Sequence, residues 1–462
     1  MRWLSLVTLI GLALAQDTTT TTTTSDTSSD TSTSRSSTSY DISDASTITG
    51  SVALPSGTYE TYSSTITLGN GDTSLEAVTT SIAANATTTG NQTVVRTTSN
   101  SVTVLVGGGG TTTLGNNSMN ATATTTSTAT KTPVINTRPC NGYVELCGRN
   151  YSNITNVAAH NSPFDRAGNA ASNQMFDVTA QLNDGVRMLQ FQVHYQNGTM
   201  LLCHTSCDIL NMGLLQTYLE TVAVWMRKNP YDVVTILMGN YDYVSPQNFT
   251  EPIKNSGLMD YVYTPTKIPM ALDDWPTLSE MILTQKRIVF FMDYQANQTA
   301  IPWLMDEFSQ IWETPFSPTN DNFPCTVQRP PGLARQGAET RMYMANHNLN
   351  LDLSFGSISL LIPNTALLNQ TNGVNGTGSL GKMARNCTAK WNRPPNFLLV
   401  DYYNYGSPKN GSVFEVAAEM NNVTYNWKCC GTKSAAVHGV SVSGISTLLA
   451  VVAGIQFLLT AF

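Results

Sequence analysis

Two histidines, each directly after a short apolar run, are the residues of this chain best placed to do chemistry. His160 follows the run from Asn156 to Ala159, and His204 follows the run from Met200 to Cys203. Runs of this kind predict β-strands, so both imidazoles are expected at the C-terminal ends of strands, where barrel enzymes hold their catalytic groups. Two histidines that converge in this way can serve as the base and the acid of one reaction.

Apolar runs alternate with helical patterns from Cys140 to Cys430. The predicted strands are Asn156 to His160, Arg187 to Val193, Met200 to His204, Val233 to Gly239, Arg287 to Asp293, Arg341 to His347 and Phe397 to Tyr402. The predicted helices are Met175 to Asn183, Leu214 to Lys228, Leu278 to Leu283, Pro302 to Trp312 and Val413 to Asn421. The alternation predicts an α/β fold with a parallel sheet, and seven strands favour a distorted TIM (β/α) barrel, whose eighth strand is not placed, over a six-stranded open sheet.

Residues 1–15 predict a cleaved secretory signal peptide. Arg2 precedes an apolar core from Leu4 to Leu14, and small residues end the stretch. A membrane anchor is the alternative, but the stretch is too short to span a bilayer.

Residues 431–462 predict a glycosylphosphatidylinositol (GPI) attachment signal, with Ser434 as the attachment site. Small residues from Ser434 to Ala436 precede a mildly polar spacer and an uncharged apolar tail from Thr447 to Phe462. That order is typical of a GPI signal, which would tie the mature protein to the membrane through a glycolipid. A retained transmembrane helix is the alternative, and it is weakened because the tail is short and no basic residue follows it.

Residues 16–131 are rich in Thr and Ser and predict a low-complexity stalk. Such a composition buries too little apolar surface to offset its backbone entropy, and Ser/Thr-rich tracts of secreted proteins commonly carry O-linked sugars. Alternating residues between Ser51 and Val106 leave a small β-rich piece as an open alternative. The predicted domain then spans residues 132–430.

Cysteines and glycosylation sequons agree with a secreted protein. Of the 8 cysteines, Cys203 and Cys207 bracket His204 and are candidates for a disulfide, and Cys140 with Cys147 can close a loop before the first strand. The other four allow several pairings, and a metal site is the alternative. Asn-X-Ser/Thr sequons stand at Asn85, Asn91, Asn116, Asn120, Asn150, Asn153, Asn197, Asn248, Asn297, Asn369, Asn375, Asn386, Asn410 and Asn422.

The charge of the chain argues against a nucleic-acid partner. The formal net charge is -7, and 12% of the residues are charged. A protein that binds nucleic acid needs a basic patch or stripe, which this composition does not supply.

Four segments together resemble a known family. They are Ala159-His160-Asn161-Ser162, the Gly-X-Arg-X-Leu core from Gly185 to Leu189, Cys203-His204, and Asn396 to Asp401. In this order and spacing they are similar to the phosphatidylinositol-specific phospholipase C-like phosphodiesterases, in particular to their surface-anchored fungal-type branch. The resemblance implies a distorted TIM barrel from about Cys140 to Cys430 and leaves the stalk and both ends uncovered.

The resemblance implies roles for three side chains. His160 matches the base that takes a proton from a hydroxyl nucleophile, and His204 matches the acid that protonates the leaving alkoxide. Asp401, at the end of the last strand, matches the carboxylate that holds an imidazole in the correct tautomer. The alternative for each histidine is a structural one, because a histidine at a strand end can simply bond a loop carbonyl.

The chain departs from the family pattern at its metal site. Calcium-dependent members carry carboxylates at the positions of Gln190 and Gln192, with an asparagine at the position of Asn161. Metal-free bacterial members carry an arginine at the Gln192 position and an aspartate at the Asn161 position. Amide oxygens are neutral and Ca²⁺ sites rely on carboxylates, so neither calcium nor another cofactor is expected.

Further residues are candidates for substrate contacts. Asn161, Gln190 and Gln192 are expected at the barrel mouth. His194 shares the face of the two glutamines and is a candidate phosphate donor, although an ordinary exposed loop histidine is the favoured alternative. Asp293 ends a strand and can orient a histidine or cap the following helix, and these alternatives stay open.

For two other side chains, a position away from the barrel mouth is expected or left open. Arg187 falls on the opposite strand face from the two glutamines and is expected to pack under a helix. His347 can reach the mouth or can pin a loop from a buried position.

The sequence therefore predicts a surface-anchored phosphodiesterase. Its expected substrate is a phosphodiester such as an inositol phospholipid or the phosphate of a lipid-anchored glycan. The competing prediction is a binding or wall-organising module that keeps the barrel without turnover. Gln190 and Gln192 favour the competing prediction, whereas His160, His204 and Asp401 favour the enzyme.

Overall fold

The computed structural model describes residues 57–60, 62, 64–68, 102–106, 110–114, 138–355, 358–426 and 429–430. The predicted signal peptide, most of the predicted stalk and the predicted GPI site at Ser434 lie outside these residues. Among the described residues, no helix has the length and hydrophobicity that crossing a bilayer requires. A short antiparallel hairpin joins β2 (Val102–Val106) to β3 (Gly110–Leu114).

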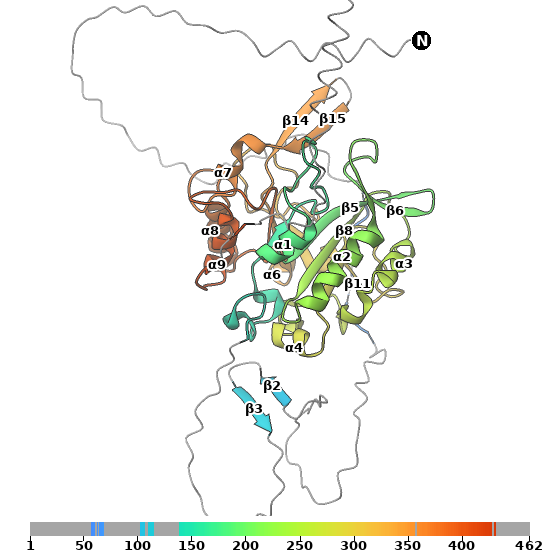
Figure 1. Cartoon of the computed structure of the whole chain (residues 1–462), viewed down its shortest axis with the longest axis vertical. Coiled ribbons are helices and arrows are strands. Elements are labelled where there is room, and N and C mark those ends of the chain that lie inside the picture. Colours follow the sequence, from blue (N-terminus) through green and yellow to red (C-terminus); the bar gives the residue numbers. More distant parts are fainter. Residues whose placement is uncertain are drawn as a thin grey trace, which may run out of the picture. The chain divides into compact units, whose positions relative to one another are not determined.

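The core is a curled parallel sheet of eight strands (Figure 1). Its strands follow one another around the curl in sequence order, and the last pairs with the first, so that Val400 of the last strand lies beside Ala159 of the first. No ladder joins the fifth strand to the sixth among the described residues, so the barrel is open at that seam. The strands are β4 (Asn156–Ala159), β5 (Met188–Gln196), β8 (Val234–Asn240), β10 (Ile288–Met292), β11 (Leu304–Asp306), β12 (Ile311–Glu313), β13 (Met342–Asn346) and β16 (Phe397–Val400).

Two predicted elements were wrong. The run from Met200 to His204 forms β6 (Thr199–Cys203), which pairs antiparallel with β5 as a hairpin and is not a barrel strand. The predicted helix from Pro302 to Trp312 contains instead the two short strands β11 and β12, joined by α5 (Glu307–Gln310). Two three-residue strands around a single helical turn leave no period long enough to distinguish them from a helix. Two of the eight barrel strands, β11 and β12, were therefore missed from the sequence.

The helices cover the outer face of the curled sheet. Figure 1 shows α2 (Leu215–Lys228) lying over β5 and β8, where its buried side chains include Leu219, Val222 and Met226. Helix α1 (Val178–Asp184) begins at Asp177, whose side chain accepts from the Ala180 N–H, and ends at Gly185 in the left-handed conformation. The others are α3 (Gln247–Asn255), α4 (Leu278–Leu283), α6 (Arg335–Glu339), α7 (Leu368–Thr371), α8 (Leu380–Trp391) and α9 (Ser412–Met420).

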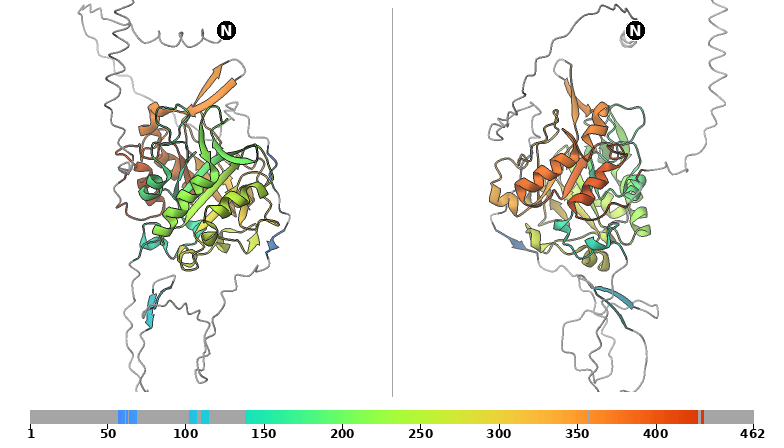
Figure 2. Two further views of the ribbon diagram at one scale, coloured as in Figure 1. Left: turned by 45° about the vertical axis from the view of Figure 1, so that its right-hand side comes forward. Right: turned by 90° about the vertical axis from the view of Figure 1, so that its left-hand side faces the viewer.

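Three shorter pairings lie outside the eight strands of the curl. Strand β7 (Asn211–Leu214) extends the β5–β6 hairpin. The antiparallel hairpin of β14 (Asn350–Phe355) and β15 (Ile358–Pro363) projects from the rest of the domain (Figure 2). A strand from the region predicted as a stalk, β1 (Ile66–Thr67), pairs with β9 (Lys267–Ile268).

All eight cysteines are paired. The structure forms the two expected disulfides, Cys140 with Cys147 and Cys203 with Cys207. The remaining pairs are Cys325 with Cys387 and the adjacent Cys429 with Cys430. No free thiol remains to support the metal site that was the alternative.

Arg187 packs away from the barrel interior, as its position on β5 predicts. Its guanidinium donates to the Asp232 carboxylate, at 2.7 Å from Nη2, and to the carbonyls of Leu182 and Val186, and it lies over the ring of Trp225. These contacts join α1, β5 and α2. Arg187 is therefore a structural residue.

We expect Arg187→Met to lower the free energy of unfolding by about 3 kcal/mol, because it leaves a largely buried carboxylate and two carbonyls without their donor. Urea unfolding followed by circular dichroism measures this. Lys254→Met is the matched control, since its ion pair with Glu251 is exposed and should contribute less than about 1 kcal/mol. Equal losses in the two variants would contradict the assignment.

Candidate active site

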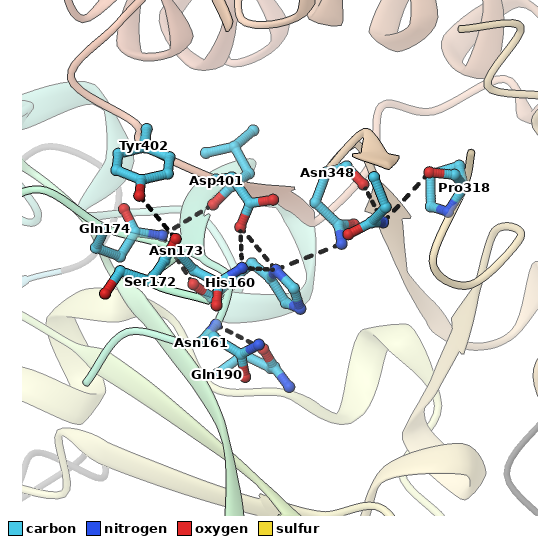
Figure 3. A network of polar contacts seen from close by, with 12 residues as sticks. His160, Asn161, Ser172, Asn173, Gln174, Gln190, Pro318, Asn348, Asp401 and Tyr402 are labelled. Carbon is cyan, nitrogen blue, oxygen red and sulfur yellow. Dashed lines mark hydrogen bonds and ion pairs between the residues drawn. The ribbon is translucent and has the colours of Figure 1, made fainter. Parts of the chain in front are cut away.

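His160 and Asp401 lie side by side because β4 and β16 are paired. The register sets Ala159 beside Val400, so the next residue of each strand, His160 and Asp401, emerges at the same point of the barrel rim. His160 Nδ1 is 2.8 Å from Asp401 Oδ1 (Figure 3), and the Asp401 side chain is buried. An ionised carboxylate only accepts hydrogen bonds, so Nδ1 carries the proton and Nε2 is left for proton transfer.

Three amide side chains surround this pair. Asn173 Nδ2 donates to Asp401 Oδ1 at 2.8 Å, and Asn348 Nδ2 lies 3.4 Å from His160 Nδ1 (Figure 3). Gln174 Nε2 donates to the backbone carbonyl of His160 at 2.8 Å. Asn173 and Gln174 come from the long loop after β4, where no sequence spacing pointed to them. Asn173 therefore holds the Asp401 carboxylate and Gln174 holds the His160 backbone, and both help to fix the orientation of the imidazole.

His204 reaches the site from the β5–β6 hairpin rather than from a barrel strand. The disulfide between Cys203 and Cys207 closes the loop around it. The hydroxyl of Thr205 lies 3.2 Å from His204 Nδ1, and the ring of Phe164 meets the imidazole edge-on. Burial, together with the nearby His160 and His194, lowers the pKa of His204 to about 4. His204 is therefore neutral at pH 7 in the free protein.

The residue after each of these three groups has a left-handed backbone. The φ angle is 49° at Asn161, 59° at Thr205 and 44° at Tyr402. This conformation is costly for residues other than glycine, most of all for a β-branched residue such as Thr205, and such strain is concentrated at functional sites. The chain thus makes a sharp turn directly after His160, His204 and Asp401.

Gln190 and Gln192 hold two of these turns. Gln190 Oε1 accepts from the Asn161 N–H at 3.0 Å, and Gln192 Oε1 accepts from the Thr205 N–H at 3.3 Å. Because these amide oxygens already bind backbone donors next to His160 and His204, they do not form the charged oxygen cage that Ca²⁺ requires. The residues present do not fit a calcium ion. Asn161 Oδ1 is buried and has no partner within the described residues.

The two histidines open onto one cavity of about 760 Å³. Its wall also includes Asn161, Gln190, Gln192 and Asp293, so the expected convergence of these side chains at one mouth is observed. Two exposed aromatic residues, Tyr241 and Tyr243, stand at the same cavity.

A buried ionic cluster forms another part of the cavity wall. Arg329 Nη1 donates to Glu313 Oε2 at 3.0 Å, and Arg329 Nη2 donates to the Tyr294 hydroxyl at 2.9 Å. Burial raises the pKa of Glu307 well above its usual range, and the neighbouring Glu313 raises it further. The sequence analysis missed this cluster, because Glu307 and Glu313 lie at the ends of elements hidden in the predicted helix.

Asp293 joins the ionic cluster. Its Oδ1 accepts from the backbone N–H groups of Asn240 and Tyr294, and its Oδ2 lies 4.0 Å from Arg329. It neither orients a histidine nor caps a helix, so both alternatives considered for it were wrong. Burial raises the pKa of Asp293 to about 6, against the opposing charge of Arg329.

Two histidines lie outside the cavity wall. His194 is buried within β5, stacked on Tyr241 at 4.2 Å between ring centroids, and Nδ1 lies 3.7 Å from Asp242. It is not the exposed loop residue favoured from the sequence, and it does not line the cavity that holds His160. His347 is buried against Phe323 with Nε2 2.9 Å from the Thr371 carbonyl, so it pins a loop.

Comparisons with known proteins identify relatives of this chain. A protein of Arthroderma benhamiae named "Uncharacterized secreted protein" is 65% identical over 314 residues, which cover 68% of this chain and 70% of that protein. "PI-PLC X domain-containing protein 1" of the same organism is 39% identical over 288 residues, which cover 62% of this chain and 90% of that protein. The solved phosphatidylinositol-specific phospholipase C from Listeria monocytogenes aligns with a TM-score of 0.40 and 13% identity, over 60% of this chain and 95% of its own. The family model described as PI-PLC X 1 matches residues 146–420, more than half of the sequence, and the chain belongs to the PI-PLC X family.

Proposed function

We propose that this protein is a phosphodiesterase that cleaves a phosphodiester by acid–base catalysis with His160 and His204, without calcium. One observation carries the proposal: two histidines from separate strand ends open onto the same cavity, and one of them is held by a buried carboxylate. This is the arrangement that a positioned base and acid need.

The reaction divides between the two histidines. Nε2 of His160 takes the proton from the attacking hydroxyl, which belongs either to the substrate's own sugar or to water. The hydroxyl oxygen forms a bond to phosphorus as the leaving alkoxide oxygen departs with its bonding electrons, and His204 gives that oxygen a proton. Asp401 accepts from Nδ1–H throughout and stabilises the imidazolium that His160 becomes.

His204 takes up the proton that it needs when the substrate binds. In the free protein His204 is neutral because burial lowers its pKa to about 4. The negative charge of a bound phosphate favours the imidazolium form and raises that pKa, so that the acid forms when the substrate is in place. Among the described residues of the cavity wall, Arg329 is the only arginine or lysine, and Glu313 and Tyr294 already engage it.

The ionic cluster supports a substrate whose head group is rich in hydroxyls. Carboxylates accept hydrogen bonds from hydroxyls and a guanidinium donates to them, so Arg329, Glu313 and Asp293 suit a head group rich in hydroxyls. We propose an inositol phospholipid or the phosphate of a lipid-anchored glycan. The name of the 39% identical relative, a PI-PLC X domain-containing protein, supports the inositol phospholipid.

The proposed location is the extracellular face of the membrane or the cell wall. The ten sequon asparagines within residues 138–430 are all exposed or partly exposed, as N-glycosylation requires, and the 65% identical relative is named a secreted protein. We propose a mature chain that starts near Gln16, carries residues 16–131 as a glycosylated stalk before the domain of residues 132–430, and ends in a GPI anchor at Ser434. Residues 1–15 and 435–462 would be removed.

Purified secreted protein is expected to cleave at least one member of a panel of phosphatidylinositol, glycerophosphodiesters and GPI glycolipids, equally with and without chelator. Phosphate-ester release, measured by mass spectrometry, reports the reaction. Loss of turnover in chelator with recovery in calcium would overturn the metal-free assignment.

Variants of Gln192 refine the same experiment. Gln192→Leu removes the acceptor of the Thr205 N–H and should lower turnover, whereas Gln192→Glu keeps an acceptor and should retain more of it. The double variant Gln190→Glu with Gln192→Asp places two carboxylates beside Asn161 and tests whether calcium binding appears. The competing function, a binding module without turnover, would give no product with any substrate.

A further inference from the structure

A segment far upstream of the family match packs against the domain. Strand β1 pairs antiparallel with β9, with Thr67 beside Lys267, and the Leu68 N–H donates to the Thr266 carbonyl at 2.9 Å. The family match begins at residue 146, and this segment belongs to the region predicted as a stalk. We call residues 57–68 the strap.

Tyr59 is the strap residue that packs on aromatic side chains of the domain. Its ring meets Phe308 edge-on at 4.8 Å between centroids, and it meets Tyr294 at 5.5 Å. Its hydroxyl lies 3.2 Å from the Tyr294 hydroxyl. Gly57 lies so close to the Tyr294 ring that a Cβ at this position would overlap it. The strap is thus fitted closely to Tyr294.

Tyr294 connects the strap to the cavity. It lines the cavity that holds both histidines, and its hydroxyl accepts from Arg329 Nη2 at 2.9 Å. A hydroxyl can donate one hydrogen bond and accept two, so the Tyr294 hydroxyl can bond Arg329 and the Tyr59 hydroxyl at the same time. Arg329 then binds Glu313. Tyr59, Tyr294, Arg329 and Glu313 thus form a continuous series of side-chain contacts that ends in the ionic cluster.

The strap also contacts the open seam of the barrel. Phe308, which packs on Tyr59, belongs to α5, the turn between β11 and β12, which do not pair with each other. Tyr62 is half-buried in the same region, where burial and the nearby Asp306 raise its pKa. No backbone ladder holds this part of the wall, so side-chain packing must do so.

We propose that the strap contributes to the active site and that Tyr59 is a positioning residue. Tyr59 orients the side chains of Tyr294 and Arg329 for binding of the substrate head group. The effect of Tyr59 on ligand affinity rests on the proposed function. The docking of the strap does not.

Docking is tested by a disulfide in the full-length secreted chain. Thr67→Cys with Lys267→Cys joins directly opposed residues of an antiparallel pair, which lie within disulfide reach. Thr65→Cys with Lys267→Cys is the off-register control. Because all native cysteines are paired, peptide mapping should find the new bond in the first variant and little in the second. Equal yields, or no bond in either, would overturn docking.

Positioning is tested without any ligand by hydrogen exchange. Tyr59→Ala is expected to raise amide exchange in the segments around Tyr294 and Arg329, whereas Ser64→Ala, at an exposed strap residue, should leave both unchanged. If Tyr59→Ala exchanges like the parent at both segments, Tyr59 does not position Tyr294 and Arg329, and the proposed role is overturned.

The effect on ligand binding is measured with inositol 1-phosphate by calorimetry. Tyr59→Phe and Tyr294→Phe each remove one hydrogen bond of the line and are expected to weaken binding about fivefold, with the double variant less than additive. Tyr62→Phe is the matched control and should bind like the parent. Failure of the parent to bind this probe would count against the proposed substrate, while the crosslink and exchange results would stand. Additive losses would overturn the coupling.

Discussion

Replacing His160 or His204 with Ala is expected to lower turnover by ~10²-fold or more, the usual scale for removing a positioned base or acid. Neither change should unfold the domain, because both imidazoles lie at the cavity rather than in the hydrophobic core. Initial rates on the best substrate of the panel, with thermal unfolding as a check on folding, measure the effect. The double variant should lose little more than either single variant, since the two histidines act as a unit.

Asp401→Asn separates orientation from proton transfer. The asparagine can hold the site's shape, but its amide can leave His160 in the wrong tautomer, so kcat should fall while the KM changes little. His347→Gln is the control at neutral pH, because His347 is buried away from the cavity. If the histidine variants bind ligand like the parent and no substrate is turned over, the binding module should replace the enzyme.

The site could be predicted from the sequence where one strand end carries one functional residue. His160 and Asp401 directly follow β4 and β16, and His204 directly follows β6, so the residue after each apolar run was the informative one. Arg329 and Asn173 gave no such signal, because both lie in loops that only the folded chain brings to the rim. The strands β11 and β12 were lost for a related reason: three residues are too few to show a period of two.

The two glutamines show how a departure from a family pattern can be misread. From the sequence they could only be described as missing carboxylates. In the structure each accepts from the N–H of a strained residue, Asn161 or Thr205, directly after a histidine. A third N–H of the same kind, that of Tyr402, donates to the carbonyl of Asn173. Neutral acceptors therefore hold the turns directly after His160, His204 and Asp401, in agreement with the proposed chemistry without a metal.

His347 is expected to make stability depend on pH. Burial lowers its pKa to about 3, whereas an unfolded chain binds the proton near pH 6.5. Above pH 6.5 the imidazole is neutral in both states. As the pH falls below 6.5 the unfolded state takes up the proton and the native state does not, so the stability contributed by neutral His347 is lost progressively down to pH 3.

The measurement must be a difference between variants, because other groups act in the opposite direction. Burial raises the pKa values of Asp293, Asp306 and Glu307, so these carboxyls favour the native state on acidification. We therefore compare parent protein with His347→Gln, which keeps a donor for the Thr371 carbonyl but does not titrate. Urea unfolding at pH 7 should show the variant less stable, and at pH 5 that deficit should shrink by about 2 kcal/mol, from 1.5 pH units at 1.36 kcal/mol each.

Phe323→Leu is the matched control for this difference. Phe323 packs directly on the His347 ring, so its truncation disturbs the same part of the core without removing a titrating group. Its deficit should stay constant from pH 7 to pH 5, to within about 0.5 kcal/mol. The His347 ring also contacts the Thr371 and Gly378 backbone and the Met383 sulfur, none of which carries a charge at any pH in this range. If the deficit of His347→Gln also stays constant, His347 binds protons in the native state as readily as in the unfolded state. The prediction of a buried, neutral imidazole would then be wrong.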